Sequence, residues 1–117
     1  MYIVYGIPNC DTIKKTRDWF TKHKIAYEFH DYKKQGISVQ KLKTWSKQLG
    51  WESLLNKRGT TWRQLDPAIQ ATITNEKAAI NLLAEYTSMI KRPLIEQGDK
   101  VVALGFNEAE YAKLFKK

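Results

Sequence analysis

Cys10 is the residue with the most distinctive chemistry, and it is the single cysteine of this 117-residue chain. It cannot form an intramolecular disulfide, and with His23 and His30 it shows no spacing typical of metal ligands. It follows the turn Gly6-Ile7-Pro8-Asn9 and begins a predicted helix. Unpaired N–H groups at a helix N-terminus stabilise a thiolate. We therefore interpret Cys10 as a nucleophile with a lowered pKa, the alternative being a small buried cysteine that packs as an apolar residue.

Polar residues next to Cys10 could modify its chemistry. Thr12 could donate its hydroxyl to the thiolate, or it could serve only as an ordinary residue of the first helical turn. Lys14 and Lys15 would favour the thiolate and Asp11 would oppose it, although the two lysines could equally form a solvated helix face. The net expectation is a shift of the Cys10 pKa downward.

The charge is unevenly distributed. The chain has 20 basic and 12 acidic residues, a formal charge of +8, and residues 1–63 hold 13 of the basic and 5 of the acidic side chains. Such a field attracts anions, either small ones such as thiol peptides and oxyanions or large ones such as nucleic acid. The four tryptophans and the lysines between them could form a stacking surface, but aromatic residues within helical patterns are usually core, so we expect no nucleic-acid partner.

The chain shows no signal for a membrane or for secretion. No apolar run approaches the roughly 20 residues that a membrane helix needs, and the N-terminus lacks a charged region followed by an apolar stretch. We expect a cytoplasmic protein that is monomeric and makes no membrane contact.

A strand, a helix and a second strand are predicted to position Cys10. The segment Tyr2–Tyr5 is β-branched and aromatic, the apolar positions from Asp11 to about His23 fall on one helical face, and Ile25–Tyr32 is a second strand candidate. A βαβ unit of this length predicts two parallel strands with a right-handed crossover. Residues 33–36 are predicted to form a turn.

The remaining elements are predicted from their capping residues. Ser38, Asp66 before Pro67, Asn75 and Asn107 are typical helix N-caps, and Pro93 begins an extended segment that turns at Gly98 into a hairpin of residues 94–96 and 101–104. We expect Val39, Leu42, Trp45, Leu49, Ala79, Leu82, Leu83, Tyr86, Tyr111, Leu114 and Phe115 to lie inward, and residues 57–60 to be an exposed loop. The order β-α-β, helices, β-β-α predicts an α/β thioredoxin-like fold, a single domain of residues 1–117 with a helical insert at about 38–90.

The segment Gly6–Thr12, followed by Lys14-Lys15, resembles the active-site loop of the arsenate reductase (ArsC)-like proteins of the thioredoxin superfamily, the group that also contains the Spx regulators. The resemblance extends over nearly the whole chain and includes Arg58, the segment Lys91-Arg92-Pro93-Leu94 and Gly105-Phe106. No single motif is specific, but four in this order are. The chain is similar to the branch described as glutathione-dependent thiol reductases.

The resemblance implies roles for individual residues. Cys10 would be the nucleophile, Arg92 would face it, and Pro93 would follow Arg92 through a cis peptide bond. Arg58 would bind an anion, or it could be a solvated loop residue. Asn9, Thr12, Lys14 and Pro93 are the further candidates for substrate and anion binding. From its residue type alone, Arg92 could instead pair with a buried carboxylate or stack on an aromatic ring.

Two departures from the family pattern narrow the expected function. The third arginine of glutaredoxin-linked arsenate reductases is absent from Val101-Val102-Ala103, which leaves an oxyanion pocket one cation short and argues against arsenate as substrate. In the loop of Arg58, an ungapped comparison places the arginine of the arsenate-reducing pattern at Asn56. Ile13 stands where Spx regulators mostly have a second cysteine, so an external thiol must resolve Cys10.

The sequence thus predicts a thiol/disulfide oxidoreductase that forms a mixed disulfide on Cys10, with no bound cofactor or metal. Glutathione is expected as co-substrate and partner, together with an oxidised small-molecule or protein thiol as substrate. An arsenate reductase and an Spx-like regulator that binds RNA polymerase are the alternatives.

Overall fold

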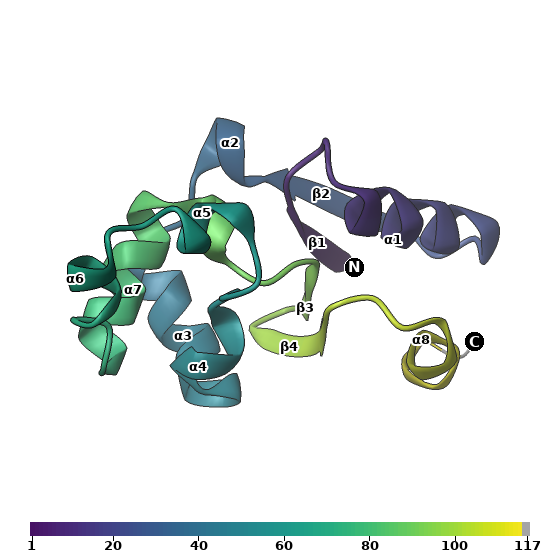
Figure 1. Ribbon diagram of the computed structural model, residues 1–117. Helices are drawn as coiled ribbons and strands as arrows, with labels where there is room; N and C mark the ends of the chain where they lie inside the picture. Colours follow the sequence, from purple (N-terminus) through teal and green to yellow (C-terminus); the bar gives the residue numbers. More distant parts are fainter. Residues whose placement is uncertain (116–117) are drawn as a thin grey trace. The chain divides into compact units, whose positions relative to one another are not determined.

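The computed structural model describes residues 1–115 and divides into two compact units. One unit holds Met1–Gln35 together with the chain from Arg92 onward, and the other holds Gly36–Lys91. Figure 1 labels the strands and α-helices of both units. That the two units form one domain stays a prediction.

The first unit is built on a four-stranded sheet with the order β2-β1-β3-β4. Its strands are β1 (Tyr2–Gly6), β2 (Tyr27–Asp31), β3 (Leu94–Gln97) and β4 (Lys100–Leu104). β1 and β2 are parallel and are joined through the helix α1 (Asp11–Lys22), whereas β3 runs antiparallel to both β1 and β4. The predicted parallel pair, the hairpin and the thioredoxin-like arrangement are therefore confirmed.

One face of this sheet carries an apolar core that includes side chains of α1 and of the last helix, α8 (Glu108–Leu114). α1 buries the apolar stripe expected from its sequence, with Trp19 and Phe20 at its end, and α8 contributes Tyr111. The Asn107 side chain caps α8 by accepting the backbone N–H of Glu110 at 2.9 Å. The buried members of this core are Val4, Trp19, Phe20, Ile25, Ile95, Ala103, Tyr111 and Phe115.

Residues that alternate with this core point to the opposite face of the sheet. Tyr5 pairs with His30 of β2 and with Leu94 of β3, and Ile3 pairs with Glu28 and Glu96. Because side chains on a strand alternate between faces, Tyr5 and Glu96 share a face that is separate from the apolar core. This second face thus carries a buried acidic group.

The second unit is helical. It contains α3 (Val39–Leu49), α4 (Trp51–Leu54), α5 (Thr60–Arg63), α6 (Pro67–Gln70), α7 (Glu76–Glu85) and the 3-10 helix η1 (Thr87–Met89). The predicted caps are confirmed, since Ser38, Asp66 and Asn75 each accept a backbone N–H of the following helix. The buried Ser46 of α3 donates to Glu76 of α7 at 2.9 Å and joins the two longest helices of the unit.

Several predicted boundaries and inward positions are wrong. β2 begins at Tyr27 rather than Ile25, and Tyr32–Gln35 forms the short helix α2 rather than a strand end and a turn. The reason is local, because the Asp31 carboxylate accepts the N–H of Lys33 and bends the chain. The loop predicted at residues 57–60 ends one residue early, since Thr60 already begins α5.

Three residues expected to lie inward are exposed because each sits at a helix end. Val39 is the first residue of α3, Tyr86 is the C-cap of α7 and Leu114 is the last residue of α8, and 38 to 45% of their surface is accessible. At a helix end the chain turns away from the helical period, so the apolar spacing no longer predicts burial. No helix in the described residues is both long and apolar enough to cross a membrane.

Candidate active site

Cys10 occupies the N-cap of α1, one residue before the helix that was expected to begin with it. Its backbone is extended, with φ −127° and ψ 129°, and its carbonyl accepts the N–H of Lys14 at 3.0 Å to close the first helical turn. Its side chain is half-buried and makes no capping hydrogen bond. An N-cap side chain faces the N–H groups of the second and third helical residues, here Thr12 and Ile13. The fold thus places the Cys10 thiol opposite unpaired backbone N–H groups at the start of α1.

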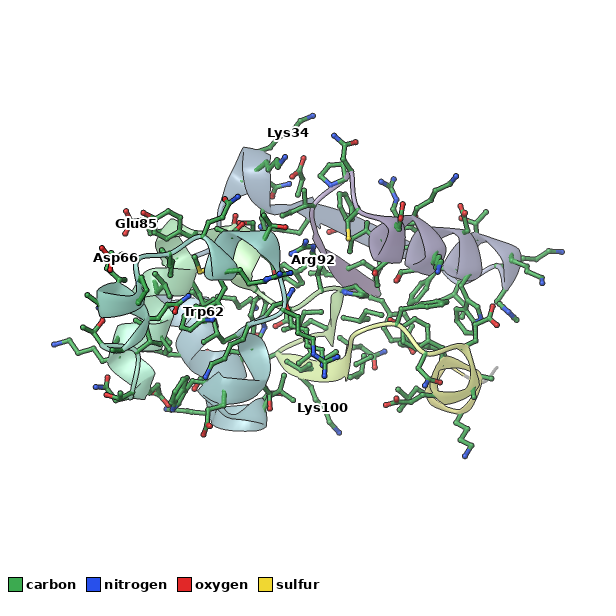
Figure 2. The ribbon with its side chains drawn as sticks, viewed as in Figure 1. Lys34, Trp62, Asp66, Glu85, Arg92 and Lys100 are labelled. Atoms are coloured by element: carbon green, nitrogen blue, oxygen red, sulfur yellow. The ribbon has the colours of Figure 1, made fainter. Side chains whose placement is uncertain are left out.

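The Arg92 side chain reaches Cys10 from the far end of the sequence. Its Nε donates to the Cys10 Sγ at 3.4 Å, and Arg92 lies in the segment just before β3 (Figure 2). β3 starts at the sheet edge where β1 ends, because it runs antiparallel to β1 and pairs Leu94 with Tyr5. The sheet register therefore places this arginine next to the turn that carries Cys10.

The surroundings of Cys10 lower its pKa, as the sequence predicted. Burial raises the pKa of the thiol, but the backbone N–H of Ile13, the Arg92 side chain and the backbone N–H of Thr12 together outweigh burial. Lys14 and Lys15, from which the sequence predicts part of this effect, are exposed in α1, and the groups that lower the pKa of Cys10 are the two helix N–H groups and Arg92. Exposed charges are screened by water, whereas the helix N–H groups and Arg92 act at close range.

Pro93 follows Arg92 through a cis peptide bond, as the resemblance implied, and is buried. Its carbonyl accepts the N–H of Gly105 at 2.8 Å, which ties the start of β3 to the end of β4. The segment that carries Arg92 is thereby attached to the hairpin.

The other predicted site residues of this unit surround the start of α1. Asn9 is exposed in the turn before Cys10, and Lys14 is exposed one helical turn further on. The Thr12 carbonyl accepts the hydroxyl of the buried Thr16 at 2.8 Å, and it is the backbone N–H of Thr12 that lowers the pKa of Cys10. Substrate or anion binding by these three residues stays a prediction.

Arg58 belongs to the second unit. It is exposed in the turn before α5, and its backbone N–H donates to the Asn56 side chain at 3.1 Å. Its assignment to anion binding stays a prediction. In the hairpin, Ala103 is buried in the apolar core, and Val101 and Val102 are half-buried, so the described side chains of this segment offer no cation.

Sequence reasoning missed a buried polar cluster on the second face of the sheet. The Tyr5 hydroxyl donates to the Glu96 carboxylate at 2.9 Å, and the Tyr32 ring stacks on Tyr5 at a centroid distance of 6.1 Å. Tyr32 is buried, and its hydroxyl has no hydrogen-bond partner among the described residues. The one signal in the sequence was an acidic residue within a strand that is otherwise apolar.

Two grooves lie along α1. A wide groove of about 770 Å³ runs between α1 and the start of α8, and its lining, which includes Trp19, Lys22 and Phe106, does not include Cys10. A smaller groove of about 320 Å³ is lined by Pro8, Lys14 and residues of the outer face of α1. The reactive groups at Cys10 therefore lie outside the larger groove. Among residues 1–115, no group of three or more His, Cys, Asp or Glu side chains could hold a metal ion.

Known proteins similar to this chain include both uncharacterized and regulatory ones. An uncharacterized protein of Haemophilus influenzae is 44% identical over 115 residues, which cover 98% of this chain and 99% of that protein. The regulatory protein MgsR of Bacillus subtilis is 28% identical, covering 97% and 89% of the two chains. The global transcriptional regulator Spx of Streptococcus mutans is 26% identical, covering 94% and 80%.

Solved structures agree in fold and in length. The YffB protein is 46% identical, with a TM-score of 0.90 and coverage of 97% of this chain and 98% of that one. An arsenate reductase (ArsC) related protein from Brucella melitensis is 41% identical, with a TM-score of 0.78 and coverage of 99% and 95%. The model of the ArsC family matches residues 5–114, which include the Cys10 turn, Arg92 and the whole sheet except its first residues. The chain therefore belongs to the ArsC family and has its thiol-redox fold.

Proposed function

We propose that this protein is a monothiol oxidoreductase in which Cys10 attacks an oxidised sulfur and glutathione regenerates the free thiol. The observation that carries the proposal is the hydrogen bond from Arg92 Nε to Cys10 Sγ at 3.4 Å. A cationic donor held against a sulfur at a helix N-terminus favours the thiolate, which is the reactive form of cysteine. The lowered pKa of Cys10 supports the same conclusion.

The proposed reaction has two exchanges. The Cys10 thiolate attacks the glutathionyl sulfur of a mixed disulfide, forms a Cys10–glutathione disulfide and releases the substrate sulfur as a thiolate. A glutathione thiolate then attacks the glutathionyl sulfur of that adduct, releases the Cys10 thiolate and leaves as glutathione disulfide. The starting mixed disulfide itself forms from the oxidised substrate sulfur and a first glutathione molecule. The complete reaction therefore converts two glutathione molecules to one glutathione disulfide, and this oxidation supplies the two electrons. Arg92 stabilises the anionic sulfur before and after each exchange.

Glutathione is the proposed resolving thiol for two reasons. Cys10 is the single cysteine, so the second thiol must come from another molecule. Glutathione is a small anion, and the formal charge of +8 favours anionic partners. We further propose that the protein acts as a monomer in the cytoplasm, where thiols are kept reduced.

A glutathione-coupled reduction assay with a small mixed disulfide tests the proposal. Cys10→Ser should abolish turnover, and intact mass should show a single glutathionyl adduct on the wild type after exposure to glutathione disulfide and none on the variant. Lys22→Gln, at an exposed position of α1, is the matched control and should keep its rate. Turnover that survives Cys10→Ser would contradict the mechanism.

The same assay with arsenate as oxidant separates this proposal from the arsenate reductase alternative. Arsenate reduction needs cations around the oxyanion, and the described hairpin residues Val101, Val102 and Ala103 supply none. We expect no acceleration of arsenate-dependent glutathione oxidation, whereas a clear acceleration would favour that alternative.

A regulator is the second candidate, favoured by the similarity to Spx and MgsR over 94 to 97% of this chain. Ile13 at the position of the second cysteine argues against a disulfide switch. Co-purification of RNA polymerase subunits with the tagged protein, unchanged by Cys10→Ala, would favour the regulator over the enzyme. Loss of turnover in Cys10→Ser without such co-purification would favour the enzyme.

A further inference from the structure

Glu96 is a carboxylate with no accessible surface, in the middle of β3. An isolated buried charge is costly, so a buried carboxylate needs both hydrogen bonds and an opposite charge. The pairing of β3 with β4 is irregular between Ile95 and Glu96, which marks this position as a special point of the strand. The fold therefore keeps an acidic group at a position where an apolar residue could be buried without this desolvation cost.

Tyr5 provides one of the two requirements. Its hydroxyl donates to Glu96 Oε1 at 2.9 Å, and both side chains are buried. Burial raises the pKa of Tyr5, and the hydrogen bond to Glu96 and the charge of Glu96 raise it further, so Tyr5 stays a neutral donor. A neutral hydroxyl orients one carboxylate oxygen but does not itself balance the negative charge of the carboxylate.

Arg92 is the cation best placed to balance Glu96. It lies four residues before Glu96 and is half-buried, whereas the other lysines and arginines that the structure describes in this unit are exposed. Tyr32 relates the positions of Glu96 and Arg92 to each other. This residue comes directly after β2, at the edge of the sheet where β1 ends, and its ring stacks on that of Tyr5. Burial and Tyr5 raise the pKa of Tyr32, the charge of Arg92 lowers it and the charge of Glu96 raises it. Both charges therefore act on one buried hydroxyl.

We propose that Glu96, anchored by the Tyr5 hydroxyl, is a positioning residue that holds the Arg92 guanidinium in the orientation in which its Nε faces Cys10 Sγ. A guanidinium carries five N–H donors in a planar fork, so it can donate to a carboxylate on one side and to sulfur through Nε on another. Glu96 then acts through Arg92 and touches neither substrate nor thiol. This role of Glu96 rests on the proposed function, in which Cys10 is the reactive thiol and Arg92 stabilises its anionic form.

The pKa of Cys10, measured from the pH dependence of its alkylation by iodoacetamide, tests this assignment. Removal of a negative charge by itself lowers the pKa of a nearby thiol. Loss of the Arg92 orientation raises it. The direction of the change in Glu96→Gln thus separates positioning from simple electrostatics. We expect the pKa to rise by at least half of the rise in Arg92→Gln, with alkylation near neutral pH slowed roughly threefold or more.

Glu28→Gln is the matched control. Glu28 and Glu96 pair with the same residue, Ile3, from opposite sides, but Glu28 is exposed. Glu28→Gln therefore removes the same charge at the same level of the sheet, and we expect it to leave the pKa of Cys10 unchanged. Should Glu96→Gln fail to fold, Tyr5→Phe removes only the anchoring hydroxyl and should raise the pKa in the same direction by a smaller amount.

An unchanged or lowered pKa of Cys10 in folded Glu96→Gln would overturn the inference. If Glu96→Gln does not fold, the same result in Tyr5→Phe would overturn it. Alkylation needs neither glutathione nor turnover, so the two proposals fail separately. A raised pKa with no glutathione-dependent turnover in the wild type would leave the positioning role intact and contradict the proposed enzyme. Normal turnover of the wild type together with an unchanged pKa of Cys10 in Glu96→Gln would support the proposed enzyme and contradict the positioning role.

Discussion

Arg92 Nε lies 3.4 Å from Cys10 Sγ, although the two residues are 82 positions apart in the sequence. The contact forms because β1 and β3 are antiparallel neighbours, so that the end of one strand and the start of the other meet at one edge of the sheet. The thiol at the α1 N-terminus and the guanidinium before β3 are thus held by the most central strand pair of the first unit. The chemistry proposed for this protein depends on that register.

Substitution of Arg92 should raise the pKa of Cys10 in a graded way. Arg92→Gln removes the charge and the fixed Nε donor, whereas Arg92→Lys keeps the charge on a flexible stem. We expect the pKa to increase from wild type to Lys to Gln, with thiolate at neutral pH reduced roughly tenfold in the Gln variant. The pH dependence of alkylation measures it, and equal pKa values in all three proteins would contradict the role assigned to Arg92.

The lowered pKa of Cys10 should also make stability depend on pH. A thiol whose pKa is lower in the folded state loses its proton more readily when folded, so its contribution to the free energy of unfolding is lost as pH falls through the folded pKa. The stability of the wild type relative to Cys10→Ser should therefore increase from about pH 5 to about pH 9, the range that leads up to an ordinary thiol pKa. Urea unfolding under reducing conditions measures this difference. A difference that is constant across the range would show that the thiol pKa is not lowered by folding.

Gly6→Ala should disturb the site through Ile13. A Cβ on Gly6 would overlap Ile13 Cδ1 and lie 2.8 Å from its Cγ1, and Ile13 is fully buried. Overpacking of this kind costs about 1 to 3 kcal/mol. Because the Ile13 N–H helps to lower the pKa of Cys10, displacement of α1 should also slow alkylation near neutral pH. Thermal unfolding and alkylation of the same sample report the two effects, and unchanged values for both would show that the space at Gly6 is not needed.

Tyr32→Phe should stabilise the protein or leave its stability unchanged. The Tyr32 hydroxyl is buried and has no hydrogen-bond partner among residues 1–115, so its removal relieves the cost of a desolvated polar group. The expected gain in the free energy of unfolding is about 1 kcal/mol, measured by urea denaturation. A loss of similar size would mean that an ordered water molecule satisfies the hydroxyl.

Local sequence signals account for much of the fold. Ser38, Asp66, Asn75 and Asn107 cap helices as their residue types predict, because an N-cap depends on a side chain and on N–H groups two or three residues away. The parallel β1 and β2 and the β3–β4 hairpin follow from segment lengths and turn residues. Cys10 at the start of a helix was predictable for the same reason, and its lowered pKa with it.

Only the tertiary structure decided which groups act on that cysteine. The adjacent Lys14 and Lys15, which the local sequence suggested, are exposed, whereas the distant Arg92, which the family resemblance implied, donates to the thiol. Residue type left open whether Arg92 would pair with a carboxylate or face the thiol, and the one sign that Glu96 would be fully buried was its position in an otherwise apolar strand. Local patterns determine backbone conformation because their partners lie within a few residues. Burial and charge pairing instead depend on strand register, which brings together residues that the sequence keeps far apart.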